Sequence, residues 1–225
     1  MTVPTPDFYT SIHKAIRLAM SEFLVTTGAT DPADPAAWCE VEERWRRIKS
    51  LLDAHSRHED VFVHPLIHRA APDVAVLLDR QHEQLDSGIR ALDSAIEDLA
   101  GNSNSEVRRR AGRDFYRAFS SFTARYFDHL AEEEASAMPA LIAGIPWDQL
   151  FAAHSALVGS LPPEERLADL PLIARSLSSP ELIGLMAATR SAASPAFFAE
   201  ARRIMEGAIG EQAFARISSA LDRAA

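Results

Sequence analysis

Apolar residues recur every three or four positions through four long segments in the first two-thirds of this 225-residue chain. That spacing is typical of one face of an α-helix. No segment shows the alternation with a period of two that is typical of a half-buried strand. Four such helices joined by modest loops predict an all-α fold in which residues 1–145 form an antiparallel four-helix bundle. Turn-forming stretches separate the segments, which cover about residues 7–27, 38–66, 72–100 and 106–138.

Two prolines are expected to interrupt these helices, because proline lacks an N–H and clashes with the preceding turn. Pro65 is expected to kink or end the second segment, and Pro139 with Gly144 is expected to close the fourth.

The last 80 residues contain six prolines, each near the start of a short amphipathic stretch. Ser179-Pro180 and Ser194-Pro195 resemble helix starts, with serine as the N-cap and proline at the first helical position. Short helices need packing to be stable. Residues 146–225 are therefore predicted to form a C-terminal appendage that packs on the bundle or on a second copy of the chain in a homodimer. Its helices are expected near residues 146–158, 164–177, 180–191, 195–208 and 210–223.

Two of the four long segments carry a histidine followed four positions later by a glutamate, namely His55 with Glu59 and His129 with Glu133. Residues at this spacing lie one turn apart on the same helix face. On a helical wheel, both pairs fall on the apolar stripe of their segment, which faces the core of a bundle. A carboxylate in that position is costly unless it is paired or binds a metal. The pattern therefore indicates metal ligation.

The other two long segments each add one histidine on an apolar face, His13 and His82. Nitrogen and carboxylate donors without thiolate suit iron, manganese or zinc. Two carboxylates that can bridge predict a dinuclear centre, in which each metal takes two histidines and shares both glutamates. Iron is preferred because this ligand set supports two oxidation states and leaves positions open for an oxygen-derived ligand. The predicted metal ligands are His13, His55, Glu59, His82, His129 and Glu133.

This ordered pattern resembles the hemerythrin-like, or HHE cation-binding, family over residues 7–145. The stretch 58–66 is also similar to the second helix of bacterial members. The resemblance implies a four-helix bundle that holds two iron ions, bridged by oxo or hydroxo and by carboxylates. The four histidines would be terminal ligands, and Glu59 and Glu133 would be the bridges.

The sequence departs from the oxygen-carrying hemerythrins at two positions. Their third helix offers two histidines one turn apart, whereas Asp86 follows His82 at that spacing here. Their fourth helix uses an aspartate five positions after its histidine, where this chain has Glu134, and Glu133 fits the bridging role better. A site with fewer histidines and more carboxylates is expected to turn over or sense oxygen or peroxide rather than carry oxygen. Asp86 is either a seventh ligand or an acceptor for His82.

Three functions remain open at this stage. The first is a di-iron protein that binds or reacts with oxygen, peroxide or nitric oxide, with possible oxidative or peroxide-consuming activity. The second is an iron or redox sensor, or an iron-homeostasis module, whose metal state controls the C-terminal appendage without turnover. The third is a metal-free helical interaction protein.

Several other side chains receive weaker predictions. His58 flanks the predicted site as a ligand, a proton relay or a boundary residue. Tyr126 is either a bundle aromatic or a hydroxyl near an open coordination position. His64 and His68 are expected on the outer, solvated face, as are the basic runs at 44–47 and 108–110, and His154 is unassigned.

The composition excludes several other classes of protein. A net charge of −9 argues against nucleic-acid or anionic-membrane binding. The single cysteine, Cys39, cannot form an internal disulfide. No apolar run approaches 18 residues, and the N-terminal residues lack the pattern of a secretory signal. A cytoplasmic protein is expected.

Overall fold

The computed structural model describes residues 6–223, and these residues form helices and connecting segments without a strand. The all-α prediction is confirmed for this part of the chain. The elements are α1 (Thr10–Ala29), α2 (Pro35–Phe62), α3 (His64–Ala70), α4 (Pro72–Ala100), α5 (Ser105–Glu132), the π-helical turn η1 (Glu133–Ala137), α6 (Met138–Gly144), α7 (Trp147–Ser160), α8 (Pro163–Ser176), α9 (Ser179–Ala192), α10 (Pro195–Ile209) and α11 (Glu211–Arg223).

The described chain divides into two compact units. The first unit holds residues 6–10 and 19–156, and the second holds residues 11–18 and 157–223. Most of α7 belongs to the first unit, where Leu150 is buried and the ring of His154 meets the ring of Phe8 edge-on, with centroids 5.7 Å apart. The division between the two units falls within α7, after residue 156.

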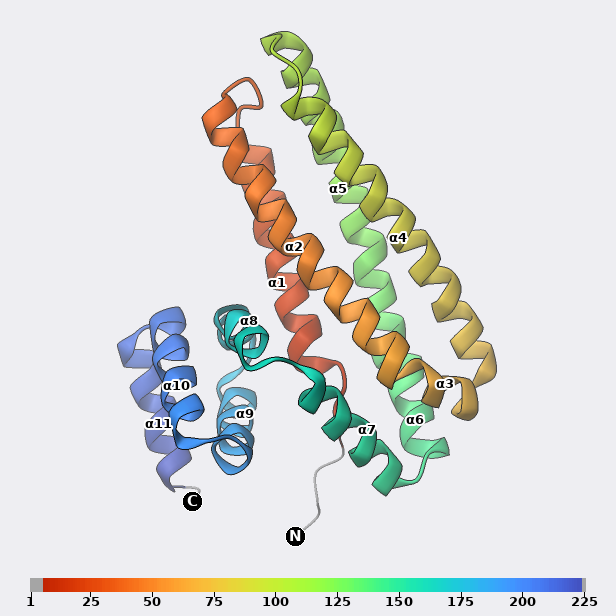
Figure 1. Cartoon of the computed structure of the whole chain (residues 1–225), viewed down its shortest axis with the longest axis vertical. Helices are drawn as coiled ribbons and strands as arrows, with labels where there is room; N and C mark the ends of the chain where they lie inside the picture. The colour runs from red at the N-terminus through yellow and green to blue at the C-terminus, as the bar shows by residue number, and fades with distance from the viewer. Residues whose placement is uncertain (1–5, 224–225) are drawn as a thin grey trace. The chain divides into compact units, whose positions relative to one another are not determined.

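Two long helices of the first unit, α2 and α5, begin where a polar N-cap side chain accepts from the exposed backbone N–H groups. Asp34 accepts hydrogen bonds from the N–H groups of Ala36 and Ala37, with Pro35 in the first turn, so α2 begins before the predicted Trp38. Asn104 caps α5 in the same way. The short turn between α4 and α5 lets these helices pack along each other (Figure 1).

Aromatic side chains fill the part of the first unit that lies near the α1–α2 and α4–α5 loops. Phe23 and Phe119 meet edge-on with centroids 4.8 Å apart, and Trp45 lies 6.1 Å from Phe119. The indole N–H of Trp45 donates to Asp93 at 2.9 Å. This rigid cluster fixes how α1, α2 and α5 pack.

The prediction that the basic run at 108–110 is solvated is wrong for Arg108, which is buried. Its guanidinium donates to the carbonyl oxygens of Pro32 at 2.6 Å, Leu99 at 2.8 Å and Asn102 at 3.1 Å. Buried carbonyl groups of loops and helix ends need hydrogen-bond donors, and the guanidinium of Arg108 is the donor for these three. A wheel of α5 alone does not show these carbonyls.

The interruptions at the two prolines have different forms. Before Pro65 the chain breaks at Val63, and α3 begins as a separate short helix. Before Pro139 the helix widens instead of ending, because the N–H of Met138 bonds to the carbonyl of Glu133 five residues back. Proline cannot donate to the carbonyl four residues before it, and the π turn accommodates that missing bond. Pro139 then lies in the first turn of α6, so the expectation is wrong for Pro139, whereas the helical run ends at Gly144 as expected.

All five short helices that the sequence predicts are present, within about two residues at each end, and the last four of them, α8 to α11, lie in the second unit. Ser194 caps α10 as expected, but the N-cap of α9 is Ser178 rather than Ser179. Glu181 completes a capping box with Ser178 and also accepts from the ammonium of Lys14 at 2.6 and 2.7 Å. A shared apolar core holds these helices, built around Leu182, Met186, Ala201, Met205, Phe214 and Ile217.

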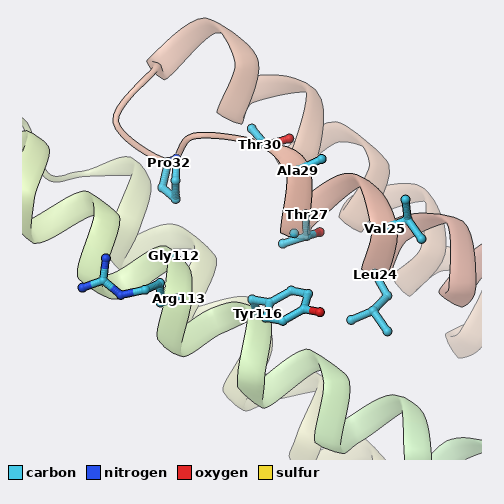
Figure 2. A pocket seen from close by; sticks show the side chains of 10 residues that line it. Leu24, Val25, Thr27, Ala29, Thr30, Pro32, Gly112, Arg113 and Tyr116 are labelled. Carbon is cyan, nitrogen blue, oxygen red and sulfur yellow. The ribbon is translucent and has the colours of Figure 1, made fainter.

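A cavity of about 480 Å³ lies between the end of α1, the following loop and α5 (Figure 2). Figure 2 shows Tyr116 extending from α5 toward α1, while the guanidinium of Arg113, the one charged group in the lining, extends away from Tyr116. Tyr116 precedes His129 by 13 positions, which is about 20 Å along a helix. This cavity is therefore remote from the histidines of the predicted site.

Gly112 lies beside this cavity with the ring of Pro32 packed directly against it, and an added Cβ would be 2.1 Å from Cγ of Pro32. We expect Gly112→Ala to lower the free energy of unfolding by about 1–3 kcal/mol, because overpacking outweighs the better helix propensity of alanine. Urea unfolding measures this. Gly101→Ala is the control, since its Cβ would meet only carbonyl oxygens at 3.7 Å or more; equal effects of the two changes would contradict the packing argument.

Candidate metal centre

The six side chains predicted from the sequence come together in the structure as two overlapping groups of possible metal ligands. In each group, one ligand atom from every residue lies within 4.8 Å of the others. Glu59 and Glu133 belong to both groups. The first group adds His13 and His55, and the second adds His82 and His129.

The helical spacing of four residues produces the two closest histidine–glutamate pairs. On α2, Nε2 of His55 lies 3.2 Å from Oε1 of Glu59. At the end of α5, Nε2 of His129 lies 3.4 Å from Oε1 of Glu133, the first residue of the π turn. From α4, Nε2 of His82 lies 3.6 Å from Glu59 and 3.9 Å from Glu133.

Both glutamates are deeply buried, Glu59 at 3% and Glu133 at 0% relative exposure. Two carboxylates this close in an apolar interior repel each other and need positive charge nearby. Met20, Ile89 and Phe122, from α1, α4 and α5, are also buried. The donor set of imidazoles and carboxylates without thiolate fits iron, manganese or zinc.

Two outer partners fix which imidazole nitrogens face the centre. Nδ1 of His129 lies 2.8 Å from Oε1 of Gln81, and Nδ1 of His82 lies 3.3 Å from Oδ1 of Asp60. Each oxygen is an acceptor, and an Nδ1 proton donated to it leaves the Nε2 lone pair of that ring directed inward. The two Nε2 atoms are 3.1 Å apart. At that distance the two atoms either share a proton in a hydrogen bond or, when both carry lone pairs, need a cation between them.

The carboxylates also shift the acid–base behaviour of their neighbours. Burial acts to lower the pKa of His82, but the nearby carboxylates of Glu59 and Asp60 outweigh it and raise that pKa. Burial and then the negative field of Glu133 and Glu59 raise the pKa of Tyr9 well above its usual range. Burial followed by the same two carboxylates raises the pKa of Tyr126. Both phenols therefore keep their protons beside the centre.

The expectation that His64 lies on the solvated face is wrong, because His64 is buried. Its ring stacks on that of His82 with centroids 4.6 Å apart, and its Nδ1 lies 3.0 Å from Asp79. A helical wheel of α2 assigns faces correctly only up to Val63, because α2 ends there and α3 redirects the chain. His68 is exposed as predicted, with Nε2 3.1 Å from Asp79.

The residues left open by the sequence take distinct places. Tyr126 is buried in the core, and its ring meets that of His129 edge-on with centroids 6.1 Å apart. His58 is half-buried and Asp86 is exposed, and neither belongs to a group of possible ligands found among the described residues. The carboxylate beside Nδ1 of His82 is that of Asp60, which sequence reasoning missed together with Gln81. A third group joins Asp60, His64 and His82.

A cavity of about 280 Å³ is lined by Tyr9 and by Glu134, the residue after Glu133, and by Pro6, Asp7, Thr10, Met138 and Ile142. The negative field of Glu133 and Glu59 acts on the buried Tyr9. The cavity therefore adjoins the centre through Tyr9 and is large enough for a small polar molecule.

A family model described as the hemerythrin HHE cation binding domain matches residues 6–141. Comparison with the curated proteins and with the solved structures finds no match. In the part of the chain that the structure describes, no helix combines the length and the apolar character needed to cross a bilayer.

Proposed function

The chain belongs to the hemerythrin HHE cation-binding domain family, and on that premise we propose that it is a non-haem di-iron protein that binds or reacts with oxygen, peroxide or nitric oxide. In this proposal, α1, α2, α4 and α5 form an antiparallel four-helix bundle around the two metal ions. His13, His55, His82 and His129 are terminal ligands, and Glu59 and Glu133 are bridges.

One observation carries the proposal, namely that the two groups of possible ligands share both glutamates and no histidine. A single ion would need one group. Two groups with common carboxylates supply two ions, each with two imidazole nitrogens and two shared oxygens. The facing Nε2 atoms of His82 and His129 at 3.1 Å support a cation in the second group.

The residues of the chain account for how such a centre would work. A pair of iron ions, bridged by oxo or hydroxo as well as by carboxylates, supplies redox chemistry toward oxygen-derived ligands when bound. Gln81 and Asp60 keep the imidazoles turned inward. The buried Met20, Ile89 and Phe122 limit access of water. The cavity beside Tyr9 admits a ligand of the size of peroxide, and the protonated phenol offers it a hydrogen-bond donor.

Metal analysis of the aerobically purified chain tests the proposal. We expect about two iron ions per chain and a near-ultraviolet absorption band from an oxo bridge, because each ligand group provides four donors. A well-folded protein that contains no metal contradicts the proposal. Two equivalents of zinc or manganese after growth in iron-replete medium would contradict the choice of iron while retaining the ligand set.

One contact favours the alternative of an iron or redox sensor without turnover. Lys14, the residue after His13, binds Glu181, which caps α9 in the C-terminal helices. A change at His13 could thus reach the start of α9 through one salt bridge within the second unit. Peroxide turnover that is lost in Glu133→Ala favours the enzyme. Absence of turnover, with metal-dependent protection of residues 157–223 from protease, favours the sensor.

A further inference from the structure

The ring of His82 lies between two consecutive carboxylates of α2. Glu59 lies 3.6 Å from its Nε2 on the side of the metal centre, and Asp60 lies 3.3 Å from its Nδ1 on the outer side. Consecutive helical residues point about 100° apart, so one helix can face both nitrogens of one imidazole. Among the four histidines of the centre, His82 is the one at its rim, with 11% of its side chain exposed. A ligand at the rim needs support that core packing does not provide.

A second contact restrains the same ring. His64 stacks on His82 at 4.6 Å with the planes inclined by 25°. The carboxylate of Asp79 holds His64 in turn through Nδ1 at 3.0 Å. This stacking depends on the break at Val63, because a continuous α2 would direct His64 away from the centre. Because α3 redirects the chain, the imidazole ring of His64 stacks on the ring of His82.

We propose that Asp60 and His64 are positioning residues for His82: Asp60 accepts its Nδ1 proton, and His64 fixes the plane of its ring, so that Nε2 remains directed at the second metal ion. This inference rests on the proposed di-iron centre. A histidine that ligates through one nitrogen needs its other N–H held by an acceptor, and loss of such an acceptor weakens metal binding by about 10–100-fold. The effect is confined to the ion that His82 binds, because the first group does not contain His82.

The same three residues could instead bind a cation themselves, since Asp60, His64 and His82 also form a group of possible ligands. The positioning role is favoured by the chemistry of the imidazole ring. A metal on each nitrogen would require the ring to lose both protons, whereas ligation through Nε2 alone leaves the Nδ1 proton for Asp60. The two possibilities differ in the number of ions bound, which a titration counts.

The test is an anaerobic titration of the full-length chain with ferrous iron, in competition with a chromophoric chelator. The wild type should bind two equivalents. In Asp60→Ala, one equivalent should weaken by about 10–100-fold while the other stays within about threefold. Asp60→Asn keeps an acceptor oxygen and should recover most of the lost affinity. His64→Phe keeps a stacking ring and should also bind two equivalents. Asp86→Ala, which removes an exposed carboxylate one turn after His82, is the matched control and should match the wild type.

Each other outcome overturns the inference in a recognisable way. If Asp60→Ala binds two equivalents of iron with unchanged affinity, the positioning role is contradicted, while the proposed di-iron centre is retained. A third tight equivalent in the wild type, lost in both Asp60→Ala and His64→Phe, makes the group a cation site of its own. Equal weakening of both ions in a variant with altered unfolding indicates a general structural effect. A wild type that binds no iron overturns this inference and the proposed function together.

Discussion

Glu133→Ala is expected to abolish binding of both metal ions, with a loss of affinity of more than about 100-fold for each, because ligands contribute more than the outer residues whose loss costs about 10–100-fold. Glu133 is a member of both ligand groups, and its carboxylate lies within 3.9 Å of His82 and His129. It is fully buried, so no solvent-borne anion replaces it. Metal analysis of the purified variant, followed by titration of the metal-free protein, measures the effect.

Glu134→Ala provides the control for this result. Glu134 is the neighbouring glutamate, is exposed, and stands five positions after His129, where the oxygen carriers place their carboxylate. We expect this variant to retain both ions. Retention of metal in Glu133→Ala with loss in Glu134→Ala would instead assign the bridge to Glu134, and the spacing of four residues would then have no role in ligation.

Removal of the metal is the second change with a large expected effect. A ligand that binds only the folded state at 1,000 times its Kd stabilises that state by about 4 kcal/mol. For a protein of this size each kcal/mol shifts Tm by about 2–4 °C, so a strong chelator should lower Tm by roughly 10 °C. The physical source is the pair of buried carboxylates, Glu59 and Glu133, whose charges the metal ions compensate.

Glu133→Met separates this effect from simple loss of packing. The substitution removes one buried charge and roughly conserves volume, so the metal-free variant should unfold at or above the Tm of the metal-free wild type. The chelator should then leave its Tm unchanged. A metal-free variant that is markedly less stable than metal-free wild type would show that Glu133 stabilises the fold without metal.

The features that the sequence predicted correctly are those that a single helix determines. The spacing of four residues between His55 and Glu59, and between His129 and Glu133, survives folding because each pair lies on one turn of helix or at its end. The apolar stripe also determines which face is buried. The structure places the six residues in two overlapping groups of possible ligands, and their role as metal ligands stays a proposal.

The features that escaped prediction depend on a second element or on a local change of helix type. His64 was assigned to the wrong face because Val63 ends α2. Asp60 and Gln81 contact histidines from neighbouring helices, and no pattern within one segment reveals such pairs. Arg108 is buried because its guanidinium donates to carbonyl oxygens of a loop and of the end of another helix. The π turn at Glu133 follows from Pro139, but the sequence alone suggested that the helix ends there.

The division of the chain into two units has a consequence for the order in which these units can fold during synthesis. Residues 11–18 belong to the same unit as residues 157–223, so Lys14 and Glu181 are partners 167 positions apart. At ribosomal rates of about 5–20 residues per second, Glu181 is synthesised roughly 8–30 s after Lys14. Residues 19–156 emerge during that interval and can begin to fold first. The early part of α1 therefore finds its partners in the second unit only after residues 157–223 have also been made.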